Sequence, residues 1–243
     1  GTHDLSVSDG DGVSMTRVLL VQLPIPRQNF GRKTGNVPLG AACLKQAVRN
    51  LSGVTVDILP ESVVSYLADA ALVEAIRDRR PDVVGFTVFS WNIERSLHIC
   101  EKIKEAGGPR IVFGGPEITP DNDLPRAPQV DFRVHGEGEA VFRRLLSEPG
   151  FWANGSAAES AADIFRSAPS PYLSGWLEPE VQRLMLLETQ RGCPYRCGFC
   201  YYNKSRAGLV FAEEEHLLRA VAWAVERRIS EVYLLDPSLN ARP

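Results

Sequence analysis

Short apolar runs and longer amphipathic segments alternate along most of the chain. Apolar runs with strand character lie at residues 17–22, 55–59, 83–89, 110–113 and 131–134. Between them, apolar residues recur with helical spacing at residues 39–50, 63–79, 93–105 and 139–146. This alternation is typical of α/β domains, because each helix returns the chain to the start of the next parallel strand. The pattern therefore predicts a doubly wound, parallel, five-stranded sheet over residues 16–147.

The rest of the chain divides into an extension, a linker and a second α/β unit. Residues 1–15 contain glycines and serines without hydrophobic periodicity, so they are predicted to form a flexible N-terminal extension. Residues 148–180 are rich in turn-forming residues and are predicted to be a linker with a short helical piece at 157–165. Residues 181–243 form the second unit. Its predicted elements are a strand at 184–187, a helix at 213–228 and a strand at 231–235.

Three cysteines lie directly after the first strand of this second unit. Cys193, Cys197 and Cys200 have the spacing C-x3-C-x2-C. An iron–sulfur cluster held by three protein thiolates leaves one iron open to another ligand, as a catalytic metal site requires. A structural zinc site or a disulfide pair is the alternative. A closed zinc site needs a fourth ligand, and disulfides are rare in cytosolic proteins.

The segment 191–200 resembles the cluster loop of the radical S-adenosylmethionine (SAM) superfamily, in which an aromatic residue, here Phe199, commonly precedes the last cysteine. The resemblance implies that Cys193, Cys197 and Cys200 hold a 4Fe–4S cluster and that SAM chelates its open iron. One electron from the cluster then cleaves a C–S bond of SAM to give a 5′-deoxyadenosyl radical. The resemblance further implies that residues 181–243 are the start of a partial TIM-like barrel. Because two strands cannot close a barrel, we expect the chain to be a portion of a longer enzyme, with a second chain that supplies the missing half as the alternative.

Two polar residues after the last predicted strand occupy the place where this superfamily contacts the amino group of SAM. Asp236 and Ser238 are therefore candidate SAM ligands. The glycine-glycine-glutamate segment that usually makes this contact is absent from the chain. A turn that merely caps the strand is the alternative interpretation.

Glycine-containing loops follow the predicted strands of the first unit. Ligands of open parallel sheets bind beyond the carboxyl ends of the strands, where glycine lets the backbone approach closely. Placed ahead of the cysteine loop, this series resembles the Rossmann-like cobalamin-binding domain of cobalamin-dependent radical SAM enzymes. The resemblance carries cobalamin-binding roles to the matching residues, which are Leu39, Gly40, Ser90, Trp91, Asn92, Gly114, Gly115, Pro116, Glu117, His135, Gly136, Glu137, Gly138 and Glu139.

The Asp-x-His-x-x-Gly motif, whose histidine supplies the lower cobalt ligand in some other cobalamin families, is absent from the sequence. We therefore expect cobalamin to bind with its own base displaced and no histidine on the cobalt. Trp91 is a candidate shield for the lower face, because its loop follows the central strand near the switch point of the sheet. Packing in the interface between the two units is an equally good account of Trp91. His135 either approaches the corrin or bonds a neighbouring backbone group.

Composition narrows the partners and the compartment. The formal net charge of −3 gives no basic signature for a nucleic-acid partner. No apolar stretch reaches the length of a membrane span, and we expect a cytoplasmic protein without a membrane partner. Cys43 and Cys100 lie among apolar neighbours and are interpreted as small buried hydrophobes. His216, at the start of a predicted helix, is interpreted as a surface or capping residue.

The resemblance implies that the intact enzyme is a cobalamin-dependent radical SAM methyltransferase. One SAM methylates reduced cobalamin. The radical from a second SAM abstracts a hydrogen atom from an unactivated carbon of the substrate, and this carbon then takes the methyl group from methylcobalamin. The expected partners are a peptide or small secondary metabolite as substrate and an electron donor for the cluster. A rearrangement or cyclisation without methyl transfer is one alternative, and a cobalamin-binding fragment without activity is another. A methylthiotransferase is disfavoured, because Cys43 and Cys100 do not make the second cysteine set of that family.

Overall fold

The computed structural model describes residues 15–25, 36–105, 107–177, 183–202, 208–238 and 241. The predicted N-terminal extension lies outside these residues except for Met15. Parts of three predicted segments also fall outside them: the loop after the first strand, the end of the linker and the end of the cysteine loop.

A six-stranded parallel sheet forms the centre of the N-terminal unit, with the strand order β2-β1-β3-β4-β5-β6. The strands are β1 (Thr16–Val21), β2 (Val54–Ile58), β3 (Val83–Thr87), β4 (Arg110–Gly114), β5 (Phe132–Val134) and β6 (Ser156–Ala157). The predicted α/β class and the five predicted strands are confirmed. The sheet has one more strand than predicted, because the segment interpreted as linker adds β6 beside β5.

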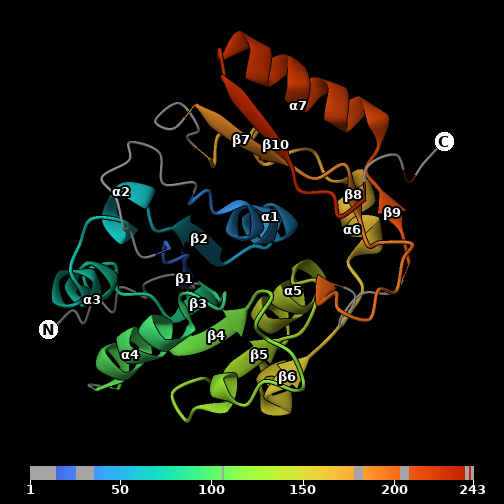
Figure 1. Ribbon diagram of the computed structural model, residues 1–243. Helices are drawn as coiled ribbons and strands as arrows, with labels where there is room; N and C mark the ends of the chain where they lie inside the picture. The colour runs from blue at the N-terminus through green and yellow to red at the C-terminus, as the bar shows by residue number, and fades with distance from the viewer. Residues whose placement is uncertain are drawn as a thin grey trace, which may run out of the picture.

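Helices cover both faces of this sheet (Figure 1). One face packs against α1 (Leu39–Val48), α5 (Glu139–Ser147) and the short helix η2 (Pro149–Asn154). The other packs against α2 (Glu61–Val64), α3 (Asp69–Arg77) and α4 (Ile93–Lys104), and the short helix η1 (Leu124–Arg126) lies between β4 and β5 in the chain. Alternate side chains of β1 serve the two faces, since Leu19 and Val21 belong to one core and Val18 and Leu20 to the other.

The predicted helix at 63–79 is wrong as a single element, because the structure divides it into α2 and α3. The break is occupied by a side chain from α4. Arg95 donates hydrogen bonds to the carboxylate of Asp69 at 2.8 Å and to the backbone carbonyl of Leu67 at 3.4 Å. This contact joins positions 26 and 28 residues apart, so the local hydrophobic pattern carries no sign of it.

The second unit consists of β7 (Leu184–Leu187), α7 (Glu214–Glu226) and β10 (Glu231–Leu234), with β10 parallel to β7. These elements match the predicted strand, helix and strand. The short strands β8 (Gln190–Arg191) and β9 (Val210–Phe211) pair antiparallel and were not predicted. The predicted helical piece of the linker is α6 (Ala162–Ser167), which begins later than expected, while Ser156 and Ala157 form β6.

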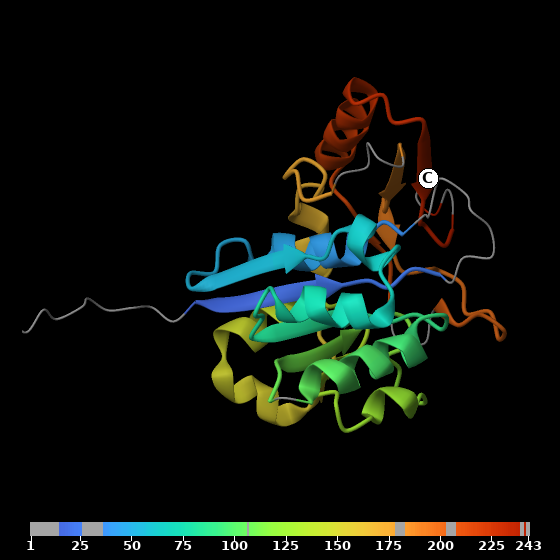
Figure 2. The ribbon, with the colours of Figure 1, turned by 90° about the vertical axis from the view of Figure 1, so that its left-hand side faces the viewer.

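Helix α1 lies between the sheet and the second unit (Figures 1 and 2). Ala41 and Val48 face the sheet, whereas Leu39 and Ala42 belong to a separate core with residues of β7 and α7. That second core includes Tyr172, whose hydroxyl accepts the backbone N–H of Leu186 at 3.0 Å. Both faces of α1 are therefore covered. Within the described residues, no helix combines the length and apolar character needed to cross a bilayer.

Candidate functional site

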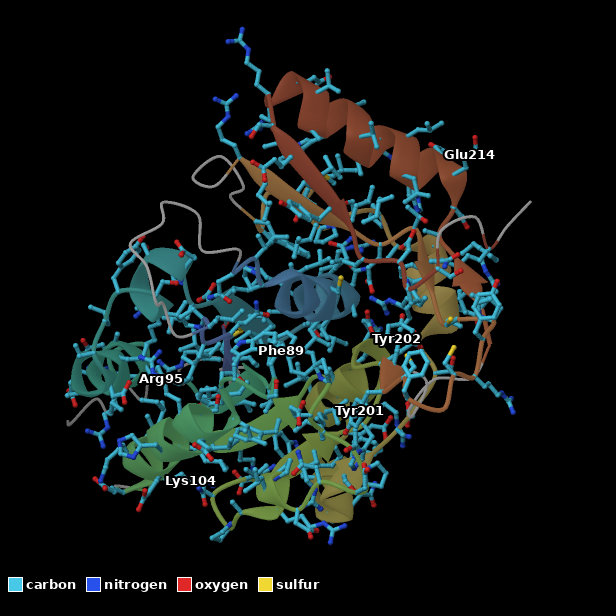
Figure 3. The ribbon with its side chains drawn as sticks, in the orientation of Figure 1. Phe89, Arg95, Lys104, Tyr201, Tyr202 and Glu214 are labelled. Carbon is cyan, nitrogen blue, oxygen red and sulfur yellow. The ribbon has the colours of Figure 1, made fainter. Side chains whose placement is uncertain are left out.

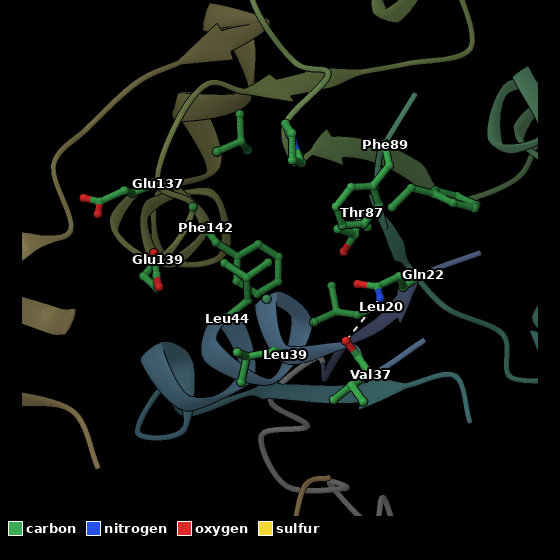
Figure 4. Close-up of a pocket in the computed structure, with 18 of the residues that line it drawn as sticks. Leu20, Gln22, Val37, Leu39, Leu44, Thr87, Phe89, Glu137, Glu139 and Phe142 are labelled. Carbon is green, nitrogen blue, oxygen red and sulfur yellow. Dashed lines mark hydrogen bonds between the residues drawn. The ribbon is translucent and has the colours of Figure 1, made fainter. Parts of the chain in front are cut away.

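A cavity of about 480 Å³ lies at the carboxyl ends of the central strands. Side chains and backbone of β1, β3, β4 and β5 form its floor, through Leu20, Gly85, Val112 and Val134. Leu44 of α1 and Phe142 of α5 add apolar wall, and Figure 4 shows them between the glutamates at one end and Gln22 and Phe89 at the other. This position is the ligand site expected for an open parallel sheet, at the switch point between β1 and β3.

Most of the residues predicted to bind cobalamin line this one cavity. They are Leu39, Gly40, Trp91, Gly114, Gly115, Pro116, Gly136, Glu137, Gly138 and Glu139. Ser90, Asn92, Glu117 and His135 do not appear among its lining residues. The structure thus brings together four loops and helix ends that are far apart in the sequence, while the contact of each residue with cobalamin stays a prediction.

Two of the glycines that line the cavity are suited to their positions for different physical reasons. Gly115 has φ +114, and a Cβ there would lie 2.6 Å from the carbonyl oxygen of Val88, so the loop after β4 needs glycine for its own packing. At Gly40 a Cβ would meet no atom within 4 Å. Glycine at position 40 therefore keeps space open where α1 borders the cavity.

Asn92, which does not line the cavity, is buried and holds the loop after β3. Its amide nitrogen donates to the carbonyls of Leu23 at 3.0 Å and Thr87 at 3.1 Å, and its side-chain oxygen accepts the N–H of Phe89 at 2.8 Å. These bonds tie the loop after β3 to the end of β1. Asn92 thereby fixes the position of Phe89, which lines the cavity.

Trp91 stacks on Phe89, with ring centroids 4.4 Å apart and ring planes within 7° of parallel. Both rings line the cavity, and Trp91 is partly exposed to solvent. A flat aromatic pair therefore borders the space in which a corrin would lie. The shielding of cobalt by Trp91 stays a prediction.

His135 and Glu117 make contacts of their own away from this cavity. The Nδ1 atom of His135 lies 3.0 Å from the carbonyl oxygen of Ile118, which is the neighbouring backbone contact foreseen for it. Asn122 donates to both the backbone carbonyl and the carboxylate of Glu117, at 3.0 and 3.3 Å. Both residues therefore stabilise the segment that follows β4.

Gln22 and Asn36 line the cavity and were missed by the sequence analysis. Gln22 donates to the carbonyl of Val37 at 3.2 Å (Figure 4). Gln22 also donates to the side-chain oxygen of Asn36 at 3.0 Å, and Asn36 donates to the carbonyl of Gln22 at 3.0 Å. Both side chains are buried. Gln22 directly follows the apolar run of β1, so its place at the end of a central strand was a usable signal.

A buried arginine joins the cavity to the cysteine loop. The guanidinium of Arg191 lies 2.7 Å from Glu139, 2.9 Å from Glu188 and 3.7 Å from Glu137. Burial acts to lower the pKa of Arg191, but the carboxylates of Glu139 and Glu188 outweigh it and raise the pKa, so the side chain stays charged. All four residues line the cavity. The pairing of Arg191 was not predicted.

The cysteine loop runs along the edge of this region. Cys193 is half-buried, Cys197 and Cys200 are exposed, and Phe199 has 94% of its surface accessible. The N–H of Cys200 donates to the carbonyl of Cys197 at 3.0 Å. Among the described residues, no three His, Cys, Asp or Glu side chains are already gathered to hold a metal ion. The thiol set fits an iron–sulfur cluster by its chemistry and its access to solvent.

Two tyrosines follow the last cysteine of the loop, and Figure 3 marks both. The hydroxyl of Tyr201 lies 2.8 Å from the hydroxyl of Thr119, in the segment that follows β4. The N–H of Gly192 donates to the hydroxyl of Tyr202 at 3.4 Å. Tyr201 therefore gives the cysteine loop a second contact with the N-terminal unit.

Asp236 and Ser238, the candidate SAM ligands, contact the segment that leads into the cysteine loop. Asp236 accepts the backbone N–H groups of Thr189 at 2.8 Å and Gln190 at 3.2 Å, and it also accepts the hydroxyl of Thr189. The carbonyl of Ser238 accepts the side-chain amide of Gln190 at 2.6 Å. These bonds favour a structural role for Asp236 as a brace on the loop after β7, and SAM contact stays a prediction.

The two remaining cysteines have environments unlike those of the loop cysteines. Burial, followed by the carboxylate of Glu139, raises the pKa of the Cys43 thiol to about 12. Burial also raises the pKa of the Cys100 thiol. Both are therefore neutral thiols at ordinary pH, in agreement with their interpretation as small hydrophobes. His216 lies on α7, with its Nε2 atom 4.0 Å from the carboxylate of Glu213.

Comparison with known families supports the assignment of the cavity. The family described as B12 binding domain matches residues 33–146. Residues 33–146, a little under half of the chain, are similar to a B12-binding domain. This match spans the loops after β3, β4 and β5 and the start of α1, which together line the cavity. The resemblance to cobalamin-dependent radical SAM enzymes is confirmed by the relatives described next.

Two curated relatives are methyltransferases. The 2-(S-pantetheinyl)-carbapenam-3-carboxylate methyltransferase of Streptantibioticus cattleyicolor is 29% identical, over 91% of this chain and 38% of its own length. The cobalamin-dependent radical SAM methyltransferase TokK of Streptomyces tokunonensis is also 29% identical, over 67% of this chain and 28% of its own. The chain thus spans well under half the length of these relatives.

Another relative and a solved structure widen the comparison. The anaerobic magnesium-protoporphyrin IX monomethyl ester cyclase of Rubrivivax gelatinosus is 25% identical over 68% of this chain and 35% of its own length. The cobalamin-dependent S-adenosylmethionine radical enzyme OxsB superposes with a TM-score of 0.67, covering 95% of this chain and 35% of that one, at 19% sequence identity. The likeness to OxsB shows a shared fold.

Proposed function

We propose that this chain works within a cobalamin-dependent radical SAM methyltransferase that adds a methyl group to an unactivated carbon. One observation carries the proposal. The cavity of the B12-binding domain is lined both by the glycine loops after β4 and β5 and by Glu188 and Arg191, which lie five and two residues before Cys193. The proposed cobalamin site and the proposed cluster loop therefore border the same space, as an enzyme that combines the two cofactors requires.

The residues of the chain would divide the work between two cofactors. Cys193, Cys197 and Cys200 would hold a 4Fe–4S cluster, and the cavity would hold cobalamin against the aromatic pair of Phe89 and Trp91. When bound, the cluster with SAM would supply a radical and cobalamin would supply the methyl group. The apolar floor of the cavity would exclude water from the reacting groups.

The substrate is proposed to be a small secondary metabolite or a peptide. The carbapenam carboxylate in the name of the Streptantibioticus relative supports a small molecule. An electron donor for the cluster is the second proposed partner. Most of the length of the matched relatives lies outside the segment that this chain covers, so we place substrate choice chiefly there.

Anaerobic reconstitution tests the proposal. The chain is purified without oxygen, loaded with iron, sulfide and cobalamin, and examined by visible spectroscopy and metal analysis beside a variant with Cys193, Cys197 and Cys200 all changed to Ala. We expect about four irons per chain in the parent and almost none in the variant, with corrin bands in both. Corrin without iron would reduce the chain to a cobalamin-binding fragment. Iron without corrin would contradict the role proposed for the cavity.

A cyclisation or rearrangement without methyl transfer is the second candidate function. The similarity to magnesium-protoporphyrin IX monomethyl ester cyclases supports it. The two candidates differ in the fate of the methyl group of SAM. With SAM labelled in its methyl group, a methyltransferase gives a labelled product that is heavier by one methylene, whereas a cyclase gives an unlabelled product.

A further inference from the structure

Arg191, in the second unit, is a buried charged side chain with three carboxylate partners. Only 8% of its side-chain surface is exposed. Its Nη1 atom lies 2.7 Å from Glu139 at the start of α5, and its Nε and Nη2 atoms lie 3.1 and 2.9 Å from one oxygen of Glu188. A guanidinium presents its donors in a rigid planar fork, so contacts in several directions fix its orientation.

Glu137 and Phe165 extend this cluster to a third segment. One oxygen of Glu137 lies 3.7 Å from Arg191, and the other accepts the backbone N–H of Ala161 at 2.8 Å, at the beginning of α6. The guanidinium also lies over the ring of Phe165 in α6, 4.3 Å from its centroid. Arg191 therefore contacts the loop after β5, the helix of the linker and the segment after β7.

The arrangement of these contacts determines what the arginine can do. Glu137 and Glu139 belong to the N-terminal unit, whereas Arg191 comes two residues before Cys193. The glutamates had been predicted to bind cobalamin, but the carboxylate of Glu139 is directed to Arg191 at 2.7 Å. An unpaired charge in such a buried place is strongly unfavourable, so removal of either partner leaves the other uncompensated.

We propose that Arg191 is a positioning residue that docks the cysteine loop on the wall of the cobalamin cavity through Glu139 and Glu137. Its meaning for catalysis rests on the proposed function, while the contact itself does not. Because the loop leaves this anchor only two residues before its first cysteine, the ion cluster sets where the three thiols stand relative to the cavity. Tyr201, which directly follows the last cysteine, contacts Thr119 and holds the loop on that side of the cysteines.

The first test is hydrogen exchange, measured by mass spectrometry on the full chain without cofactors. Arg191→Met and Glu139→Gln should each speed exchange in peptides covering residues 188–202 by about tenfold or more, and leave the strands of the central sheet unchanged. The double variant should show no larger effect than Arg191→Met alone, because that variant already removes the pair with Glu139. Arg144→Met removes a partly exposed arginine that pairs with Glu148 and Glu159, away from the cysteine loop, and serves as the matched control.

Two outcomes of this test would overturn the proposal. Exchange rates in 188–202 equal to the parent in both single variants would show that the ion cluster does not hold the loop. Additive effects in the double variant would show that Arg191 and Glu139 act independently. If Arg191→Met does not fold, as judged by far-ultraviolet circular dichroism, Arg191→Lys and Glu139→Gln supply the same comparison, since lysine keeps the charge but loses the fork.

A spectroscopic readout separates positioning from a merely structural contribution. In the chain loaded with iron–sulfur cluster and cobalamin, paramagnetic resonance reports the magnetic interaction between the reduced cluster and cob(II)alamin. We expect Arg191→Met to change this interaction at unchanged iron and corrin content, Arg191→Lys to restore part of it, and Arg144→Met to leave it as in the parent. An unchanged interaction in Arg191→Met would contradict the positioning role. Failure of the parent to take up either cofactor would sink the proposed function while the exchange experiment still tests the anchor.

Discussion

The cavity floor and the cysteine loop border the same space, but their atoms are held in different ways. The floor consists of residues of the central sheet, and each face of this sheet packs in its own hydrophobic core. The shape of the floor is therefore fixed by the fold. The loop has exposed cysteines and is held by polar contacts of Arg191 and Asp236 before the cysteines and of Tyr201 after them. The difference supports the proposal that the cobalamin site is formed before its ligand arrives, whereas a metal would still have to gather the three thiols.

Filling the cavity from Gly40 should have the largest effect on binding. A leucine at this position enters open space beside α1, so Gly40→Leu should weaken cobalamin binding by about a hundredfold or more, equivalent to about 2.7 kcal/mol. The thermal midpoint should not fall, because leucine favours a helix over glycine by up to about 1 kcal/mol. Titration with hydroxocobalamin, followed by its visible spectrum, measures the change.

Gly150→Leu is the matched control for this prediction. Gly150 is exposed, lies outside the cavity, and likewise has no atom within 4 Å of an added Cβ. Its substitution should leave cobalamin affinity unchanged. Equal affinity of Gly40→Leu and the parent would contradict the assignment of the cavity.

The comparison also predicts unequal effects on stability. Phe113 is fully buried in the core between the sheet and α4, so Phe113→Ala should lower the free energy of unfolding by about 3–5 kcal/mol. Cys197→Ala, in the exposed part of the loop, should change it by less than about 0.5 kcal/mol in the chain without metal. Urea unfolding followed by circular dichroism gives both values. Similar losses in the two variants would mean that the loop is as integral to the fold as the sheet.

Chemical modification of single cysteines, the smallest change, tests the same difference between the packed part of the chain and the cysteine loop. In the chain without metal, iodoacetamide at pH 8 should modify Cys193, Cys197 and Cys200 and spare Cys43 and Cys100. The pKa of Cys43 is raised to about 12, so its reactive thiolate form becomes populated only as the pH approaches that value. Mass spectrometry of the intact and digested chain counts the modified cysteines. Rapid modification of Cys43 at pH 8 would show that α1 does not stay packed against the second unit.

The sequence predicted the structure correctly where a local pattern of residues determines the element. The apolar runs of β1, β3 and β4 and the glycines after the strands predicted both the sheet and the edge at which the cavity opens. Strand β6 escaped prediction because its two residues are held by backbone pairing with Arg133 and Val134 and carry no apolar run of their own.

Contacts between distant side chains account for the rest of what was missed. The pairing of Arg191 with Glu139 joins positions 52 residues apart in the chain, so no spacing rule reveals it. In the same way, the bond from Arg95 to Asp69 lies at the break between α2 and α3, where the hydrophobic periodicity continues without interruption. Gln22 and Asn36 pair although they lie 14 positions apart in the chain, and only the place of Gln22 directly after a central strand marked it beforehand.

The placement of α1 between two cores has a consequence for the order in which the molecule assembles. The second unit completes its interior with Leu39 and Ala42, residues that belong to a helix of the N-terminal unit. Tyr172, Met185 and Ala220 therefore have no finished surface to pack on until α1 has docked on the sheet. During synthesis the sheet and α1 emerge first, so the surface of α1 on which the second unit packs is made before the second unit itself.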